Sequence, residues 1–80
     1  MYYVYLPESL SIPGERYIGL TNDLSRRISE HNSGRSAHTS KFAPWRLVTC
    51  IGFSVERKAT EFERYLKSGS GHACAKKRLW

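Results

Sequence analysis

The sequence predicts one α+β domain over residues 1–80, in which helices pack on a small sheet in the order β-β-α-β-α-α. Three observations support this class. The chain has 80 residues, which is enough for one small core and too few for a second domain. β-forming segments occur near the start and in the middle of the chain. Two segments with the apolar spacing of helices follow capping or turn residues.

The first third of the chain predicts a β-hairpin. Residues 2–6 (YYVYL) and 16–20 (RYIGL) are rich in β-forming side chains, and the turn signal Pro13-Gly14 lies between them. Two strands joined in this way pair antiparallel, here through a loop that is longer than the tightest type.

A helix and a loop are expected next. The helix has its cap at Thr21 or Asn22 and ends near His31, where Asn-Ser-Gly is a stop signal. Residues 34–44 (GRSAHTSKFAP) then predict a basic loop.

The second half of the chain predicts a strand followed by helix. Residues 45–53 (WRLVTCIGF) are the third strand, in which Cys50 is expected to pack as a small hydrophobe. Ser54 is expected to cap a helix over residues 55–67 that ends at Ser-Gly-Ser-Gly. The tail, residues 72–80, predicts a last helical turn or two.

The charge balance favours a polyanionic partner. Thirteen Lys and Arg face seven Asp and Glu, which gives a net charge of +6, and such an excess is typical of nucleic-acid binding. Two cysteines without a Cys-x-x-Cys pair argue against a disulfide framework and a structural zinc site. The chain lacks a signal-peptide pattern and a membrane-length apolar run, so we expect a cytoplasmic protein that does not bind a membrane.

Helical geometry separates the two adjacent arginines of the first helix. Leu24, Ile28 and His31 fall on one stripe. Arg27 lies at the edge of that stripe, whereas Arg26 points the opposite way. For His31 two interpretations stand, a partner of the helix dipole or a functional group.

The later helix carries a glutamate at the margin of its apolar stripe. That stripe consists of Val55, Ala59, Phe62 and Leu66. Glu63 lies at its margin, while Arg57, Glu61 and Arg64 point away. Two interpretations stand for Glu63. The commoner is a partly buried salt bridge with Arg27, and the other is a site with Arg27 and Glu63 on opposite walls.

The tyrosines also have two interpretations. Tyr3 and Tyr5 share one face of the first strand, and Tyr17 and Gly19 share a face of the second. Aromatic pairs across strands usually only stabilise a sheet. A tyrosine hydroxyl also serves as an acid or base, provided that its pKa, about 10 in the free side chain, is lowered.

Several of these residues fall in segments that resemble the GIY-YIG nuclease family. The matching segments, in order, are YVY at 3–5, YIG at 17–19, NDLSRRISEHN at 22–32, PWRLV at 44–48 and FERYLK at 62–67. Five segments at compatible spacing are specific where one would be weak. The chain resembles the small stand-alone bacterial members and the catalytic domain of structure-specific endonucleases that cleave branched DNA. The glycine of the first motif is Tyr3 here.

The resemblance implies a three-stranded antiparallel sheet flanked by helices, and a divalent-metal endonuclease that hydrolyses DNA phosphodiester bonds. By position, Glu63 would hold one Mg²⁺ or Mn²⁺ ion and Arg27 would stabilise the phosphoryl group. Tyr5 would activate the attacking water with Tyr17 as its helper, and His31 would lie one turn after the arginine.

The chemistry requires these residue types. Hydrolysis adds negative charge to the phosphorane oxygens, and a cation and a metal must meet that charge in place. Mg²⁺ often takes one or two carboxylates and completes its shell with water and phosphate oxygens, so Glu63 alone suffices. Gly19, which has no side chain, lets the strand end turn close to the site.

Substrate choice is less defined by the sequence. Arg35, His38 and Lys41 are either phosphate contacts or solvated side chains. No helix-turn-helix pattern occurs, so substrate choice must come from DNA shape or from a partner protein. Two other functions fit the same fold, a noncatalytic nucleic-acid-binding module and a protein-interaction role. We favour the enzyme over these two functions, because the carboxylate of Glu63 would repel a nearby phosphate unless a metal ion lay between them.

Overall fold

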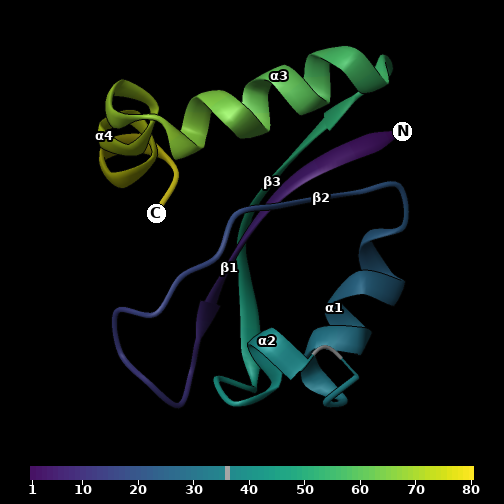
Figure 1. The fold of residues 1–80 in the computed structure, drawn as a ribbon, viewed down its shortest axis with the longest axis vertical. Helices are drawn as coiled ribbons and strands as arrows, with labels where there is room; N and C mark the ends of the chain where they lie inside the picture. The colour runs from purple at the N-terminus through teal and green to yellow at the C-terminus, as the bar shows by residue number, and fades with distance from the viewer. Residues whose placement is uncertain (36) are drawn as a thin grey trace.

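The computed structural model describes residues 1–35 and 37–80 and has the element order β1-β2-α1-α2-β3-α3-α4 (Figure 1). The strands are β1 (Tyr2–Ser9), β2 (Gly19–Thr21) and β3 (Trp45–Phe53). The helices are α1 (Leu24–Asn32), α2 (Ala37–Ser40), α3 (Glu56–Lys67) and α4 (Gly69–Arg78). The α+β class is confirmed, with one short helix, α2, beyond the expected order.

The central strand of the antiparallel sheet is β1, because the strand order is β2-β1-β3. Tyr5 pairs with Gly19 on one side and with Cys50 on the other. The register with β3 shifts between Leu6 and Pro7. Proline has no N–H to donate to a ladder, so a bulge is the expected way to accommodate Pro7 in a central strand.

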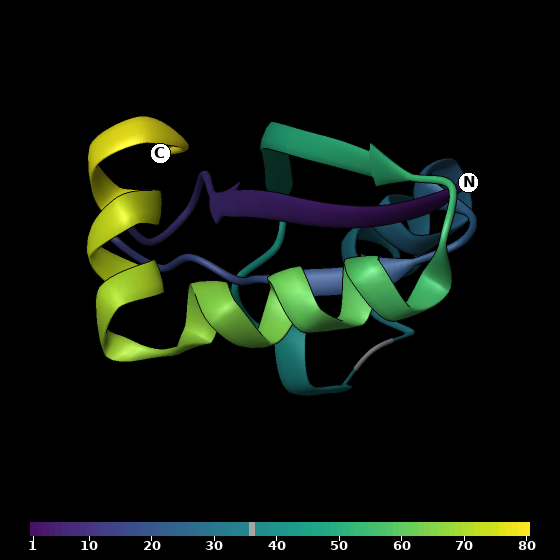
Figure 2. The ribbon, with the colours of Figure 1, turned by 90° about the horizontal axis from the view of Figure 1, so that it is seen from above.

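Side chains of β1 alternate between two faces of the sheet, as predicted. Val4 and Leu6, both 0% exposed, pack against α3 and α4. Burial of each such side chain contributes roughly 1.5–3 kcal/mol. Tyr5 points to the other face, where α1 and α2 lie. Figures 1 and 2 show the helices divided between the two sides of the sheet in this way.

The caps of α1 and α3 differ from the predicted ones. Asp23 caps α1, with Oδ1 accepting a hydrogen bond from the Arg26 N–H at 3.1 Å. Thr21 instead accepts from the Asp23 N–H at 3.1 Å and so shapes the turn before the helix. The N-cap of α3 is Val55, which provides no side-chain hydrogen bond, so the Ser54 cap is wrong.

The glycine-rich segment after α3 begins a helix instead of ending the fold. Ser68 caps α4, with Oγ accepting a hydrogen bond from the Gly71 N–H at 3.3 Å. A Cβ on Gly71 would collide with the Tyr65 carbonyl, so the first turn of α4 packs directly on the end of α3. As a result α4 has ten residues, more than the turn or two expected of the tail.

Two side chains expected inside the protein are exposed. Val55 is 45% exposed because it precedes the first turn of α3 and does not share its buried face. Cys50 is also exposed. It lies on the edge strand β3 and pairs with Tyr5, so its side chain is on the face of the sheet that points away from the α3–α4 core.

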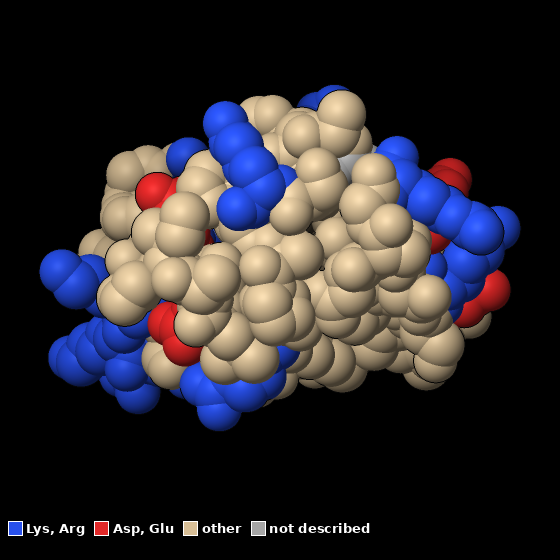
Figure 3. All heavy atoms as spheres, turned by 90° about the horizontal axis from the view of Figure 1, so that it is seen from below, with Lys and Arg blue, Asp and Glu red and all other residues tan. Residues whose placement is uncertain are grey.

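The excess of basic side chains is spread over the surface. In Figure 3 the Lys and Arg side chains gather around the edge of the face and leave its middle mostly uncharged.

Across residues 1–35 and 37–80, no helix has both the length and the apolar character needed to cross a membrane.

Candidate functional site

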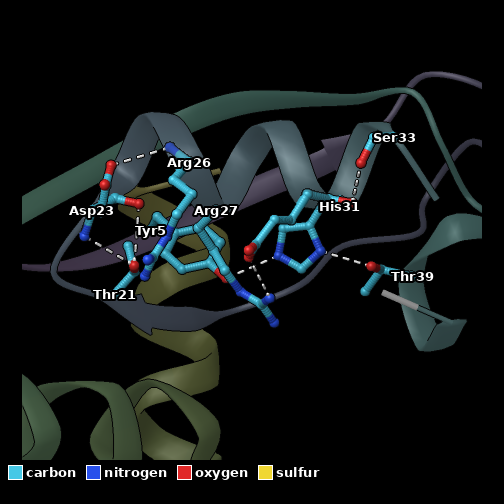
Figure 4. Close-up of polar contacts among 9 residues, drawn as sticks. Tyr5, Thr21, Asp23, Arg26, Arg27, His31, Ser33 and Thr39 are labelled. Carbon is cyan, nitrogen blue, oxygen red and sulfur yellow. Dashed lines mark hydrogen bonds and ion pairs between the residues drawn. The ribbon is translucent and has the colours of Figure 1, made fainter. Parts of the chain in front are cut away.

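The hydroxyl of Tyr5 lies at the centre of a buried polar cluster (Figure 4). Tyr5 is 1% exposed, and its Oη lies 2.9 Å from His31 Nε2. Arg27 Nε donates a hydrogen bond to the same oxygen at 3.3 Å. Gly19 makes room for this arrangement, since a Cβ there would collide with Tyr5 Cζ. The close approach expected at Gly19 therefore exists, and its partner is the Tyr5 ring.

His31 is held from its other side by α2. The imidazole is 1% exposed, and its Nδ1 lies 2.6 Å from Thr39 Oγ1. The main-chain oxygen of Thr39 accepts a hydrogen bond from Trp45 Nε1 at 2.9 Å. His31 is thus a buried member of the cluster and not a solvated partner of the helix dipole. Sequence reasoning missed Thr39, because this residue fell in the predicted loop.

The neighbouring residue, Asn32, joins the end of α1 to the start of β3. Its Oδ1 accepts a hydrogen bond from the Trp45 N–H at 2.6 Å, and its Nδ2 donates to the Trp45 carbonyl at 3.3 Å. Because His31 precedes Asn32, these two bonds also fix the imidazole relative to the sheet.

The two arginines of α1 differ as predicted. Arg26 is exposed, whereas the Arg27 side chain is 34% exposed and reaches Tyr5. Arg27 Nη1 also pairs with Glu30 at 3.1 Å. Of the two interpretations of Glu63, the salt bridge with Arg27 is wrong, because Glu63 pairs with Lys67, at 3.0 Å, on the same helix.

The cluster shifts the pKa values of its members. Burial raises the pKa of the Tyr5 hydroxyl, and the hydrogen bond from Arg27 only partly opposes this. The hydrogen bond to Tyr5 raises the pKa of Arg27, so the guanidinium keeps its charge. Burial, followed by the positive charge of Arg27, lowers the pKa of His31. At neutral pH the cluster therefore holds a neutral phenol, a neutral imidazole and a cation.

These charge states decide the direction of the hydrogen bonds. A neutral Tyr5 needs an acceptor for its O–H, and Arg27 only donates. We therefore assign the Tyr5 O–H as the donor to His31 Nε2, and His31 Nδ1–H as the donor to Thr39 Oγ1. A chain of hydrogen bonds then runs from Arg27 through Tyr5 and His31 to Thr39.

Tyr17 joins this cluster through its ring. Its centroid lies 5.4 Å from that of His31 and 6.2 Å from that of Tyr5. Unlike Tyr5, Tyr17 is only partly buried, and it lines a surface groove.

Two grooves lie near the cluster. The first, which we call the Trp80 groove, has a volume of about 560 Å³ and is lined by Tyr17, Lys67 and Trp80, among others. The second, the Arg27 groove, has a volume of about 370 Å³, and its lining includes Arg27 and Glu56.

Glu63 lies on α3, whose two ends reach the two grooves. Glu56, before it on the helix, lines the Arg27 groove, and Lys67, after it, lines the Trp80 groove. The Glu63 side chain is 19% exposed. Among the hydrogen bonds of the described residues, none joins Glu63 to Tyr5 or Arg27, so its carboxylate stands outside the polar cluster.

The carboxylate of Glu63 has the chemistry of a ligand for a hard divalent cation. Mg²⁺ is held by oxygen donors, often one or two carboxylates with water completing the shell. Glu63 Oε2 already holds one cationic group, the Lys67 ammonium. Since the Lys67 side chain is 51% exposed, it is able to move into solvent and yield this position.

The other predicted contacts lie on the surface near α2. Arg35, His38 and Lys41 are all exposed. The Lys41 ammonium lies 5.2 Å from the centroid of the Phe42 ring. His38 precedes Thr39, so α2 presents one side chain to solvent while the next anchors His31.

Comparison with known proteins places these features in one family. Residues 1–77 match the family model described as the GIY-YIG catalytic domain. The chain is 42% identical over 65 residues to the structure-specific endonuclease subunit SLX1 homolog of Giardia intestinalis, an alignment that covers 76% of this chain and 18% of that protein. It is 40% identical over 52 residues to the UPF0213 protein YazA of Bacillus subtilis, covering 64% of this chain and 52% of that protein.

A solved structure has the same fold. The solution structure of the UPF0213 protein BH0048 from Bacillus halodurans matches with a TM-score of 0.57 and 30% identity, over 98% of this chain and 85% of that one. The chain spans about half the length of the Bacillus subtilis relative and less than a fifth of the Giardia protein.

Proposed function

Because the chain belongs to the GIY-YIG family of catalytic domains, we propose that it is an endonuclease that hydrolyses DNA phosphodiester bonds with the help of a divalent cation. Relatives that are subunits of structure-specific endonucleases agree with this class of enzyme. The observation that carries the proposal is the cluster of Arg27, Tyr5 and His31, which holds a charged guanidinium at a groove next to the sheet.

Arg27 would bind the phosphoryl group. Its guanidinium is held by Tyr5 through Nε and by Glu30 through Nη1. Within the described residues these partners take two of its roughly five N–H donors, which leaves the others for phosphate oxygens. A guanidinium fixed in this way stabilises the negative charge that develops in the transition state without having to reorganise.

Tyr17 is better placed than Tyr5 to activate water. The resemblance gave that role to Tyr5, but Tyr5 is buried, its pKa is raised and its proton is donated to His31. Tyr17 is partly exposed and lines the Trp80 groove. We therefore assign the contact with water to Tyr17 and the positioning of Arg27 and His31 to Tyr5.

Glu63 would hold the cation, which we expect to be one Mg²⁺ or Mn²⁺ ion. When bound, this cation supplies Lewis-acid stabilisation of the negative charge on the phosphate oxygens. The Lys67 ammonium has to leave the carboxylate first. Ion pairs between residues four apart on a helix are worth only about 0.3–0.5 kcal/mol, so the exchange costs little.

The substrate is proposed from the relatives. Since relatives are named as subunits of structure-specific endonucleases, we expect branched or flapped DNA to be cut in preference to plain duplex. Arg35, His38 and Lys41 are proposed as phosphate contacts. We also propose that a protein partner supplies specificity. A cytoplasmic location is a further part of the proposal.

The test is DNA cleavage by matched variants. Plasmid, flapped and branched DNA are incubated with Mg²⁺ or Mn²⁺ and with wild type, Glu63→Gln or Glu61→Gln protein. Glu61 is the matched control because it lies on the same helix and also forms an ion pair with a residue four positions away, Arg57. Arg27→Ala is compared with Arg57→Ala in the same way.

We expect Glu63→Gln and Arg27→Ala to lose cleavage, while their controls keep it. Thermal melting of each variant checks that folding is retained. Equal cleavage by all the proteins would overturn the proposal, because the activity would then come from a contaminant. Salt-sensitive DNA binding without cleavage by wild type would also overturn it and would favour a noncatalytic binding module.

A further inference from the structure

The Trp80 groove contains a flat platform made by a cation and an aromatic ring. The guanidinium carbon of Arg16 lies 5.0 Å from the centroid of the Trp80 ring. Arg16 Nε also pairs with Glu8 Oε2 at 3.2 Å. Trp80 also packs against the apolar core. Both halves of the platform are therefore fixed in place before any ligand arrives.

The lining of the groove also contains basic side chains from α3 and α4. Lys67 at the end of α3 and Lys76 on α4 both line it. His72 also lines the groove, one helical turn before Lys76 on α4. In the part of the chain that the structure describes, Lys76 forms no ion pair, so its charge is not neutralised by the protein.

The charges of the lining favour an anion. The lining holds three Lys or Arg side chains against one carboxylate, that of Glu15. A stacking platform with cations beside it is typical of sites that bind single-stranded nucleic acid, because bases stack on aromatic rings and guanidinium planes while phosphates meet the cations. In a duplex the faces of the bases are covered by stacking and are not accessible to such a platform.

The groove also leads to the proposed site. Tyr17 lines the groove and contacts His31 through its ring. Lys67 lines the groove and holds Glu63 at 3.0 Å. A strand lying in the groove would therefore run past Tyr17, to which we assign water activation, and past Lys67, the partner of Glu63.

We propose that the Trp80 groove binds a short single-stranded segment of DNA, with a base on the Arg16–Trp80 platform and phosphates at Lys67 and Lys76. The inference rests on the proposed function and specifies its substrate, since a single-stranded flap or overhang would be the part of branched DNA that this domain holds. The volume, about 560 Å³, is in the range of binding sites for small ligands and suits a short stretch of single strand, not a duplex.

The test is binding without cleavage. Fluorescence anisotropy is measured in EDTA with a labelled oligothymidylate of about 12 nucleotides and with a blunt duplex of the same length. The variants are Lys76→Ala and Trp80→Leu. The matched control is Lys77→Ala, because Lys77 is the next residue on α4, is exposed and is not part of the groove lining.

We expect wild type to bind the oligothymidylate more tightly than the duplex. Trp80→Leu should weaken this binding by about tenfold, as expected for the loss of one stacked base. Lys76→Ala should lower the slope of log affinity against log salt by about 0.7, the value for one lost contact with a single strand, whereas Lys77→Ala should leave it unchanged. If Trp80→Leu does not fold, the comparison of Lys76 with Lys77 decides the question alone.

Equal effects of Lys76→Ala and Lys77→Ala, or a preference for duplex, would overturn the inference. The proposed function is tested apart from it, by adding Mg²⁺ to the same proteins. Selective binding without cleavage by any of the proteins would support the groove and reject the nuclease. Cleavage of flapped DNA at wild-type rates by Lys76→Ala and Trp80→Leu would support the nuclease and reject the groove.

Discussion

The hydroxyl of Tyr5 lies 2.9 Å from Nε2 of His31 in the interior of the domain, where each side chain is 1% exposed. This contact joins the central strand of the sheet to the end of α1 and is part of the packing as well as of the proposed site. A change in either residue therefore affects stability and activity together. Conservative substitutions separate the two effects when both the stability and the cleavage activity of each variant are measured.

The substitution Tyr5→Phe should destabilise the protein although it removes only one oxygen. His31 Nε2 would lose its partner in the interior, and an unsatisfied buried polar group costs about 1–3 kcal/mol. Arg27 Nε would lose the same partner at the edge of the cluster. Urea denaturation measures this loss. The control is Tyr3→Phe, a change on the same strand and the same face in a side chain that is only partly buried. Equal stability of wild type and Tyr5→Phe would show that the cluster does not hold the fold.

Alanine at position 19 should also be costly, for a steric reason. A Cβ there would collide with Tyr5 Cζ and with its hydroxyl oxygen, so the ring has to move away from Arg27 and His31. Overpacking of this kind costs about 1–3 kcal/mol. Gly69→Ala is the control, because nothing lies within 4 Å of a Cβ at that helical position. That control should be neutral or stabilising by up to about 1 kcal/mol in thermal or urea unfolding. A similar change in the free energy of unfolding for the variants at positions 19 and 69 would contradict this prediction.

The parts of the site that follow from local periodicity could be predicted from the sequence. The 100° step of a helix separates Arg27 from Arg26 and places Glu63 at the margin of a buried stripe. The alternation of a strand places Tyr5 on the face opposite Val4. These rules need no knowledge of neighbouring elements, and the structure agrees with them at each of these residues.

The pairing of charged residues could not be predicted, because it depends on competition between near and distant partners. Arg27 and Glu63 each find a partner on their own helix, Glu30 three residues later and Lys67 four residues later. Such neighbours are already close when the helix forms, whereas a partner on another helix is brought near only by the complete fold. The contact between His31 and Thr39 has the same origin, since it needs α2 to pack beside α1.

The second partner of His31 provides another test. Thr39→Val keeps the shape of the side chain and removes the hydroxyl, which leaves His31 Nδ1 unsatisfied in the interior. We expect a loss of about 1–3 kcal/mol in the free energy of unfolding. Thr39→Ser retains the hydroxyl and should recover most of it. A stable Thr39→Val variant together with a destabilised Thr39→Ser variant would mean that the methyl group of Thr39, and not its hydrogen bond, supports α2.

Stability should fall as the pH decreases through about 6.5, the ordinary pKa of histidine. Burial, and then the charge of Arg27, lowers the pKa of His31 in the folded protein, so protonation favours the unfolded chain. The loss should begin near the unfolded pKa, proceed at up to about 1.4 kcal/mol per pH unit, and level off below the folded pKa. Urea denaturation between about pH 5.5 and 7.5 measures this slope. His31→Gln should be less stable overall but should lose this part of the pH dependence. His72→Gln, a change at an exposed histidine, should keep the wild-type slope. A wild-type slope in His31→Gln would mean that another group is responsible.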